Sequence, residues 1–149
     1  MLNTPYQETT RDIELRVQPA FLREFSTPRL DEYVFLYKVQ LLNSFDDDIQ
    51  LISQELTIRD GNRSQYTVEI EDVNDEQACI PAGDSYEFSS CLPIDTPTGN
   101  LRGFLLVRNM RTNEFFEINL PLVFFHVQTV NQNQEISSRF PYAASMTKS

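Results

Sequence analysis

Hydrophobic and polar residues alternate with a period of two along much of this chain, and that pattern predicts β-strands. In the first such stretch, Ile13 to Val17 (IELRV), every second residue is apolar, as in a strand with one face toward water. Pro19 follows closely. Because proline lacks a backbone N–H, it limits this strand to an edge or a bulge.

The stretch from Tyr33 to Leu42 (YVFLYKVQLL) is the strongest predicted strand. One of its faces is entirely aromatic or aliphatic, and the other includes Val34, Leu36 and Leu42. A strand that is apolar on both faces is typically buried on both. We therefore expect a central strand here, partly covered on each side.

Residues with turn chemistry separate the remaining strands. Asp60-Gly61 is a strong hairpin signal, and Asn109 to Asn113 predicts a second hairpin turn. Pro93 to Gly99 predicts a long loop, and Pro121 a bend or bulge. The further predicted strands are Ile49 to Arg59, Tyr66 to Ile70, Ser85 to Cys91, Gly103 to Arg108, Phe115 to Leu120 and Leu122 to Val130.

This spacing predicts an all-β, immunoglobulin/fibronectin type III-like β-sandwich of about seven or eight antiparallel strands. A closed barrel is the alternative. The 149 residues fit one domain. We expect a flexible N-terminus at 1–10, the sandwich at 11–130, and a flexible C-terminal tail at 131–149, where the sequence is polar and without periodicity. In the alternative interpretation, Arg139 to Tyr142 (RFPY) in that tail is an aromatic docking peptide.

The chain is strongly acidic, with 22 acidic and 12 basic residues and a formal net charge of −10. No basic stripe is available to displace counterions from nucleic acid or to bind anionic lipid, so we expect neither as a partner. The opening residues are polar, and no apolar run approaches the ~20 residues of a membrane span. A soluble, cytoplasmic protein with reduced Cys79 and Cys91 is expected, with a disulfide between them as the alternative.

Residues suited to catalysis are sparse. His126 is the single histidine and lies inside a predicted strand, where a structural role is more common than a catalytic one. A Ser-His-Asp or Cys-His arrangement would need it, and no Gly-x-Ser-x-Gly elbow is present. The four glycines are too scattered for a phosphate loop. We expect no enzymatic activity, no catalytic residues and no cofactor.

Two acidic clusters could hold a divalent cation. One is Asp46 to Asp48, in a predicted turn. Hard cations need several oxygen ligands that converge on one point, and neither cluster has the spacing of a calcium loop. We therefore expect solvated surfaces, with weak cation binding as the alternative. The second cluster consists of Glu69, Glu71, Asp72, Asp75 and Glu76.

Several stretches of the chain together resemble the ApaG family. The most specific is Leu92 to Gly99 (LPIDTPTG), with Gly103 beyond it. The resemblance runs from about Ile13 to Val127 in order and spacing. Its other carriers are Ser26-Thr27-Pro28, Tyr33 to Tyr37, Ile58 to Gly61, Pro81 to Gly83, Tyr86 to Cys91 and Phe115 to Pro121.

The resemblance implies a β-sandwich with no established enzymatic activity. Bacterial members are associated by name with cobalt and magnesium tolerance, and eukaryotic relatives with protein interaction. This sequence departs from the family at Gln54 to Leu56, where Arg-His-Trp is usual. It also departs at Ile70, Asp72 and Asp75, which replace the glycines of a Gly-x-Gly-x-x-Gly stretch. The carboxylates there would repel a phosphate.

We therefore expect a non-catalytic protein-interaction module, either a monomer or a homodimer. The acidic segment from Glu69 to Glu76 is one expected contact surface. A divalent-cation homeostasis protein that binds metal or a small ligand at its acidic loops is the alternative, and a structural homo-oligomer is the third possibility. The other expected contact surface is the loop formed by Asp95, Thr96, Pro97, Thr98 and Gly99.

Overall fold

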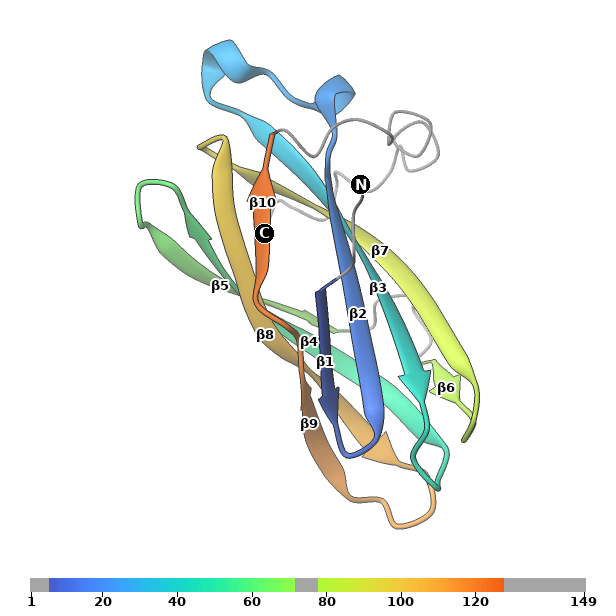
Figure 1. Cartoon of the computed structure of the whole chain (residues 1–149). Helices are drawn as coiled ribbons and strands as arrows, with labels where there is room; N and C mark the ends of the chain where they lie inside the picture. Colours follow the sequence, from blue (N-terminus) through green and yellow to red (C-terminus); the bar gives the residue numbers. More distant parts are fainter. Residues whose placement is uncertain (1–5, 72–77, 128–149) are drawn as a thin grey trace.

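A computed structural model describes residues 6–71 and 78–127. In these ranges the chain forms two antiparallel sheets that pack face to face as a sandwich (Figure 1). The helical content of the described residues is two single-turn 3-10 helices, η1 (Arg23–Phe25) and η2 (Pro28–Leu30). No helix in the described part of the chain is long and apolar enough to cross a membrane. The predicted all-β sandwich is confirmed.

The first sheet has the strand order β1-β2-β3-β7. The predicted central strand is confirmed, because β3 pairs with β2 on one side and β7 on the other. Pro19 lies beyond the last residue that β2 pairs with β1, so its backbone has no partner from β1 in the described chain. The strands of this sheet are β1 (Tyr6–Thr10), β2 (Ile13–Phe21), β3 (Tyr33–Asn43) and β7 (Ser85–Ile94).

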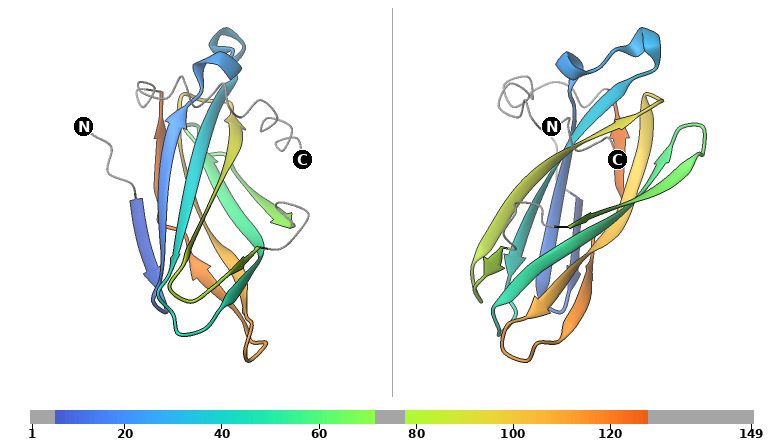
Figure 2. Two further views of the ribbon diagram at one scale, coloured as in Figure 1. Left: turned by 90° about the vertical axis from the view of Figure 1, so that its right-hand side faces the viewer. Right: turned by 180° about the vertical axis from the view of Figure 1, so that it is seen from behind.

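The second sheet has the order β10-β8-β4-β5, with two short additions (Figure 2). β4 and β5 form the hairpin that Asp60-Gly61 predicts, and β8 and β9 form the second predicted hairpin. A register shift between Leu51 and Ser53 marks a bulge in β4. The strands are β4 (Ile49–Asp60), β5 (Gln65–Glu71), β6 (Cys79–Ile80), β8 (Thr98–Asn109), β9 (Phe115–Asn119) and β10 (Val123–His126).

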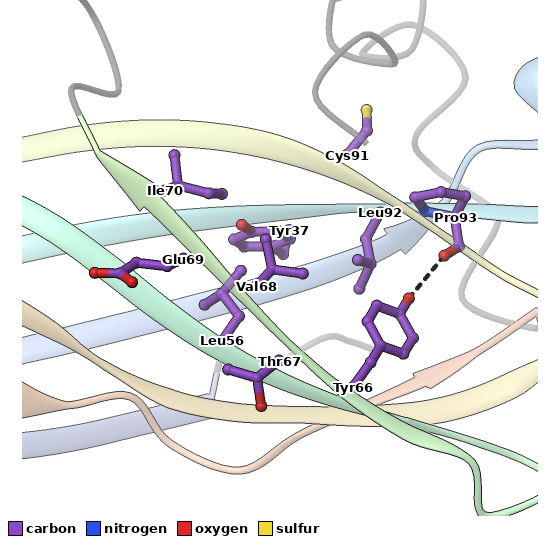
Figure 3. Close-up of a pocket in the computed structure, with 10 residues that line it drawn as sticks. All are labelled: Tyr37, Leu56, Tyr66, Thr67, Val68, Glu69, Ile70, Cys91, Leu92 and Pro93. Atoms are coloured by element: carbon purple, nitrogen blue, oxygen red, sulfur yellow. Dashed lines mark hydrogen bonds between the residues drawn. The ribbon is translucent and has the colours of Figure 1, made fainter. Parts of the chain in front are cut away.

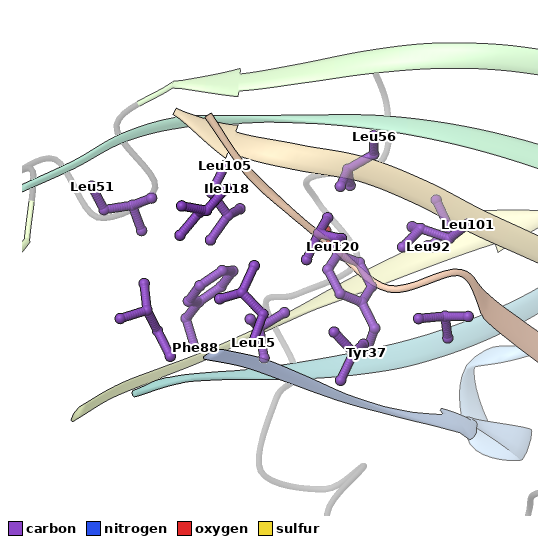
Figure 4. Packing of buried hydrophobic residues seen from close by; sticks show 14 of the residues in the cluster. Leu15, Tyr37, Leu51, Leu56, Phe88, Leu92, Leu101, Leu105, Ile118 and Leu120 are labelled. Atoms are coloured by element: carbon purple, nitrogen blue, oxygen red, sulfur yellow. The ribbon is translucent and has the colours of Figure 1, made fainter. Parts of the chain in front are cut away.

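The hydrophobic core lies between the two sheets and takes alternate residues of most of the longer strands (Figure 4). Phe35 of β3 stacks on Phe125 of β10, with ring centroids 5.0 Å apart. A second, smaller cluster lies on the outer face of the first sheet, where Val34, Leu36 and Cys91 pack with Ala20 and Leu22. This cluster covers the second apolar face of β3, as its sequence predicts.

Three boundaries differ from those expected. Tyr6–Thr10, inside the expected flexible N-terminus, is strand β1. Its side chains are mostly exposed, so its sequence lacks the apolar alternation from which a strand would be predicted. The long loop expected from Pro93 to Gly99 shrinks to 95–97, because β7 continues to Ile94 and β8 begins at Thr98. Pro93 is tolerated there because β7 is an edge strand. The last strand ends at His126, and residues 128–149, including the expected tail, lie outside the described ranges.

Candidate binding site

One side of the sandwich is open between two edge strands. β5 is the last strand of the second sheet and β7 the last strand of the first, so neither has a neighbour on its outer side in the described chain. A pocket of about 400 Å³ lies between them. Figure 3 shows its ten lining residues, which come from β3, β4, β5 and β7.

The inner surface of this pocket is largely apolar because it belongs to the sandwich core. Tyr37 of β3, Leu56 of β4 and Leu92 of β7 form its floor, and each is at most 6 % exposed. Val68 and Ile70 form the wall on β5, and both pack partly buried against the core. A strand alternates its side chains between faces, so residues between these positions point outward. The pocket is therefore a gap in the core that opens to the surface.

Tyr66 closes one end of the opening. Its hydroxyl donates a hydrogen bond of 3.1 Å to the carbonyl oxygen of Pro93, which joins β5 to β7 (Figure 3). The ring itself remains 41 % exposed. Partial burial raises the pKa of Tyr66, and the negative charges of Asp95 and Asp60 raise it further. The surface around Tyr66 is thus both aromatic and acidic.

One buried hydroxyl group, that of Tyr37, belongs to a residue that lines the pocket, and a second, that of Ser90, lies on the neighbouring strand opposite it. Burial raises the pKa of Tyr37 above its ordinary value, and the adjacent Ser90 hydroxyl opposes that shift in part. Ser90 is the cross-strand neighbour of Tyr37 and is 1 % exposed. No well-aligned hydrogen-bond partner for its Oγ exists among the described residues. An unpaired buried polar group costs about 1–3 kcal/mol, which makes this floor unusual for a core.

Gln54 is a second buried polar residue without a partner. It lies on the inner face of β4, is 1 % exposed, and is the direct neighbour of Ile70 on β5. Neither Oε1 nor Nε2 has a hydrogen-bond partner in the described chain. It is also the first of the three positions at which the sequence departs from the ApaG pattern.

Some residues of the predicted contact loop hold two neighbouring turns together. Thr96 is buried; its Oγ1 accepts a hydrogen bond of 2.8 Å from the N–H of Gly61 and donates one of 2.7 Å to the carbonyl of Thr98. A side chain at Gly99 would place its Cβ 2.8 Å from the carbonyl oxygen of Arg59. These residues fasten the β7–β8 turn to the β4–β5 hairpin. Asp95 and Pro97 are exposed and remain available to a partner.

The acidic candidates around β5 are only partly described. Glu69 is exposed at the rim of the pocket and lies directly opposite Glu55 on β4. Glu71 is the last residue of β5, and its side chain is outside the described set. Asp72, Asp75 and Glu76 also lie outside the described residues. Within the described ranges, no three acidic, histidine or cysteine side chains are placed to hold a metal ion together.

The other acidic cluster holds a turn in place. Asp47 accepts hydrogen bonds of 2.8 and 3.0 Å from the Arg111 guanidinium and one of 2.9 Å from the Asn109 amide. The bonds from Arg111, and then that from Asn109, lower the pKa of Asp47. Asp48 accepts a hydrogen bond of 2.9 Å from the N–H of Ala82. Both carboxylates therefore connect neighbouring turns.

The histidine and the cysteines lie apart from the pocket floor. His126 is an exposed residue of β10 opposite Thr98. Cys79 and Cys91 are both free thiols, the first exposed and the second buried. Burial raises the pKa of the Cys91 thiol to about 11. Its sulfur points away from the other residues that line the pocket (Figure 3).

Two of the expected contact residues lie at or near this pocket, but its lining as a whole was not predicted. Glu69 lines the pocket, and Asp95 lies close enough to Tyr66 to raise its pKa. The alternation of Tyr66, Val68 and Ile70 is visible in the sequence. However, the gap depends on which strands are left at the sheet edges, and the pattern of one strand carries no information about that.

The described fold is a fibronectin type III-like antiparallel β-sandwich with one open, acidic side. A family model described as the ApaG domain matches residues 23–109. The chain is 38% identical over 116 residues to the ApaG protein of Agrobacterium fabrum, covering 78% of this chain and 88% of that protein. With the ApaG protein of Vibrio campbellii it shares 36% identity over 103 residues, 69% of this chain and 82% of the relative.

A crystal structure of an ApaA protein from Bordetella pertussis has a similar fold, with a TM-score of 0.73 and 26% identity over 87% of this chain and 98% of that one. This chain therefore belongs to the ApaG family, and the resemblance carried by the Leu92 to Gly99 segment is confirmed.

Proposed function

We propose that this chain is a non-catalytic protein-interaction module that binds its partners through the open side of the sandwich. One observation carries the proposal. The expected contact loop of the β7–β8 turn lies next to Tyr66, which bonds to Pro93 and feels the charge of Asp95, and Glu69, the described part of the other expected surface, lines the same pocket. Two free strand edges, an exposed aromatic ring and an acidic rim together form a surface suited to a partner protein.

The charge of this surface indicates the kind of partner. Asp60 and Asp95 act electrostatically on Tyr66, and Glu69 lies beside Glu55 without a cation opposite it in the sheet. A negative rim attracts a basic segment and speeds its association. Tyrosine is enriched at the centres of such interfaces. A basic protein segment that contacts Tyr66 is the expected partner.

The non-catalytic part of the proposal is supported by the chemistry of the pocket. Tyr37 and Ser90 at its floor are neutral hydroxyls, and burial raises the pKa of Tyr37. Neither forms the nucleophile–base pair that covalent catalysis needs. His126, the histidine that such a pair would use, belongs to β10 in the second sheet, pairs with Thr98 and is not a lining residue of the pocket.

Charge reversal tests the proposal. Tagged wild-type protein and the double variant Glu69→Lys/Asp95→Lys are used for affinity purification with quantitative mass spectrometry. Recovery of genuine partners should fall at least about tenfold in the double variant, a loss of about 1.4 kcal/mol. The matched control is Glu8→Lys/Glu117→Lys, which changes the net charge equally at exposed positions on β1 and β9.

The control variant should retain the partners that the test variant loses. If every partner is recovered equally from both variants, the open side is not the contact surface. Partner binding that is insensitive to salt would contradict the electrostatic part of the proposal, because exposed charges are screened within about 8 Å at physiological ionic strength.

A role in divalent-cation homeostasis has less support from this fold than a role in protein interaction. Asp47 and Asp48, the best described members of the acidic clusters, already hold turns together. Calorimetry with Mg²⁺ and Co²⁺ tests it directly. A ligand present at 100 times its Kd would stabilise the folded state by about 2.7 kcal/mol, so unchanged melting at millimolar metal would dismiss this function.

A further inference from the structure

We infer that the pocket between β5 and β7 binds a small, uncharged, largely apolar molecule through one hydrogen-bonding group, separately from any partner protein on the rim. The volume is suitable, because small-molecule sites measure roughly 300–1,000 Å³ and this pocket holds about 400 Å³. Its location is also suitable, since the cavity belongs to the core but opens at the surface between two strand edges.

The side chains that line the pocket indicate that most of the ligand is apolar. Leu56, Val68, Ile70 and Leu92 supply aliphatic walls (Figure 3). An apolar molecule that displaces water from them is bound more tightly as it buries more apolar surface. A molecule of one or two fused rings matches the space without requiring the sandwich to open further.

The floor determines the polar group of the ligand. The Tyr37 hydroxyl lines the pocket, and the neighbouring Ser90 Oγ is buried without a well-aligned partner in the described chain. Buried polar groups are normally hydrogen-bonded, so a hydroxyl, carbonyl or amide that reaches this floor would give the Ser90 Oγ a well-aligned partner in addition to the adjacent Tyr37 hydroxyl. A charged group would instead suffer desolvation without an opposite charge to compensate for it.

Negative charge near the mouth of the pocket disfavours anions. Glu69 stands at the rim, with Glu55 opposite it on the neighbouring strand. An anionic ligand would approach the mouth against this negative charge. The rim thus disfavours anions, and the buried floor disfavours any charged group.

Two probes that differ by one hydroxyl group test this inference, namely 1-naphthol and naphthalene. Both are neutral at pH 7, and each is titrated into the full chain while its fluorescence is followed. We expect saturable binding at one site, with 1-naphthol bound more tightly. The Tyr37→Phe and Ser90→Ala variants should each weaken 1-naphthol about fivefold, consistent with one neutral hydrogen bond, and leave naphthalene unchanged.

Val68→Trp provides the steric test. It fills the pocket from a partly buried edge-strand position and should weaken both probes at least about tenfold. Leu122→Trp is the matched control, because Leu122 is 47 % exposed and is not a lining residue of this pocket. The melting temperature of each variant verifies that it is folded. Tyr37→Phe removes a single oxygen atom, so it gives a readout even if the tryptophan variant fails to fold.

Three results would overturn the inference. They are the absence of saturable binding for both probes, an equal loss in Val68→Trp and Leu122→Trp, and an equal response of the two probes to Tyr37→Phe. Because neither probe is charged, these outcomes do not depend on whether the acidic rim binds a partner. The charge-reversal experiment and the probe titration can therefore fail independently.

Discussion

At the scale of single residues, the segment that carries the family resemblance serves the fold. Thr96 connects two turns through its hydroxyl, and Gly99 leaves room for the carbonyl of Arg59. Only Asp95 and Pro97 of the predicted contact loop are exposed. A short motif can thus be distinctive because its side chains fit one turn, while the residues available for binding lie between the structural ones.

Gly103 illustrates a glycine that the sheet requires. Its φ is +154°, and a Cβ at this position would lie 2.0 Å from the carbonyl oxygen of Glu55 on the neighbouring strand. That oxygen belongs to the backbone of β4 and cannot move without breaking the pairing. We expect Gly103→Ala to lower the free energy of unfolding by about 3 kcal/mol or more.

Urea denaturation followed by circular dichroism measures that loss. Gly83→Ala is a useful comparison, because Gly83 has a positive φ of 85° but open space around it, so its cost is confined to backbone strain of about 1–3 kcal/mol. If the Gly103 variant were as stable as the wild type, the close approach of β8 to β4 would be wrong.

Asp47 should make stability depend on pH in the acid range. Its side chain is 13 % exposed and hydrogen-bonded to Arg111 and Asn109, and these bonds hold its pKa below the ordinary value of 3.8. A carboxyl with a lowered folded-state pKa stabilises the protein above its unfolded pKa. That contribution is lost as the pH falls below 3.8 and through the lower folded-state value.

The measurement compares melting temperatures of wild type and Asp47→Asn from pH 7 down to pH 3. The wild type should be the more stable at pH 7, and the difference should shrink below pH 4. High salt should also reduce it, because Arg111 is 70 % exposed. A difference that stays constant over this pH range would show that the ion pair does not stabilise the fold.

At the scale of elements, the strand edges decide which sequence features become functional. β3 and β8 are inner strands, and their apolar faces are completed by neighbours. β5 has a similar alternation but ends its sheet, so Val68 and Ile70 border a pocket instead of closed core. The same period-two pattern thus produces a closed core in one strand and the border of a pocket in another.

Glu69 and Glu55 form a like-charged cross-strand pair on the outer face of the β4–β5 hairpin. Like charges directly opposite each other are unfavourable, and cross-strand pairs contribute roughly 0.2–1 kcal/mol. Glu69→Lys should therefore stabilise the protein by about that amount at low salt. Glu69→Gln removes the repulsion without adding an attraction, so its stability should lie between those of the wild type and Glu69→Lys.

Chemical denaturation at low and high salt ranks the stabilities of the wild type, the Glu69→Gln variant and the Glu69→Lys variant. Their stabilities should converge at high salt, because both positions are accessible to ions. A destabilised lysine variant would mean that Glu69 makes a favourable contact that outweighs the repulsion. A stable variant also makes loss of partner binding in the charge-reversal experiment easier to interpret.

At the scale of the whole molecule, alternation predicted the sandwich and most of its strands but not how they are arranged. Tyr33 to Leu42 revealed a central strand because both of its faces are apolar. β1 was missed because Tyr6–Thr10 is mostly exposed and lacks such a signal. The pocket was missed because it depends on β5 and β7 having no outer neighbour among the described strands, and edge position follows from the pairing of distant strands.

In the described chain, a side-chain hydrogen bond connects the two edge strands of the open side. It runs from the Tyr66 hydroxyl to the carbonyl oxygen of Pro93. Local unfolding begins where few contacts hold an element, and β5 pairs with one neighbour, β4. We expect Tyr66→Phe to increase amide hydrogen exchange in β5, by about fivefold to tenfold if the bond contributes about 1 kcal/mol. Exchange in β3 and β8 should change little, because those inner strands open only with the whole fold.

The amides of β9, an edge strand on the far side of β8, serve as the internal control. Equal acceleration of β5 and β9 would mean that the variant weakens the sandwich generally, whereas acceleration confined to β5 would show that the two sheets are joined at this edge by a bond that a ligand or partner could displace.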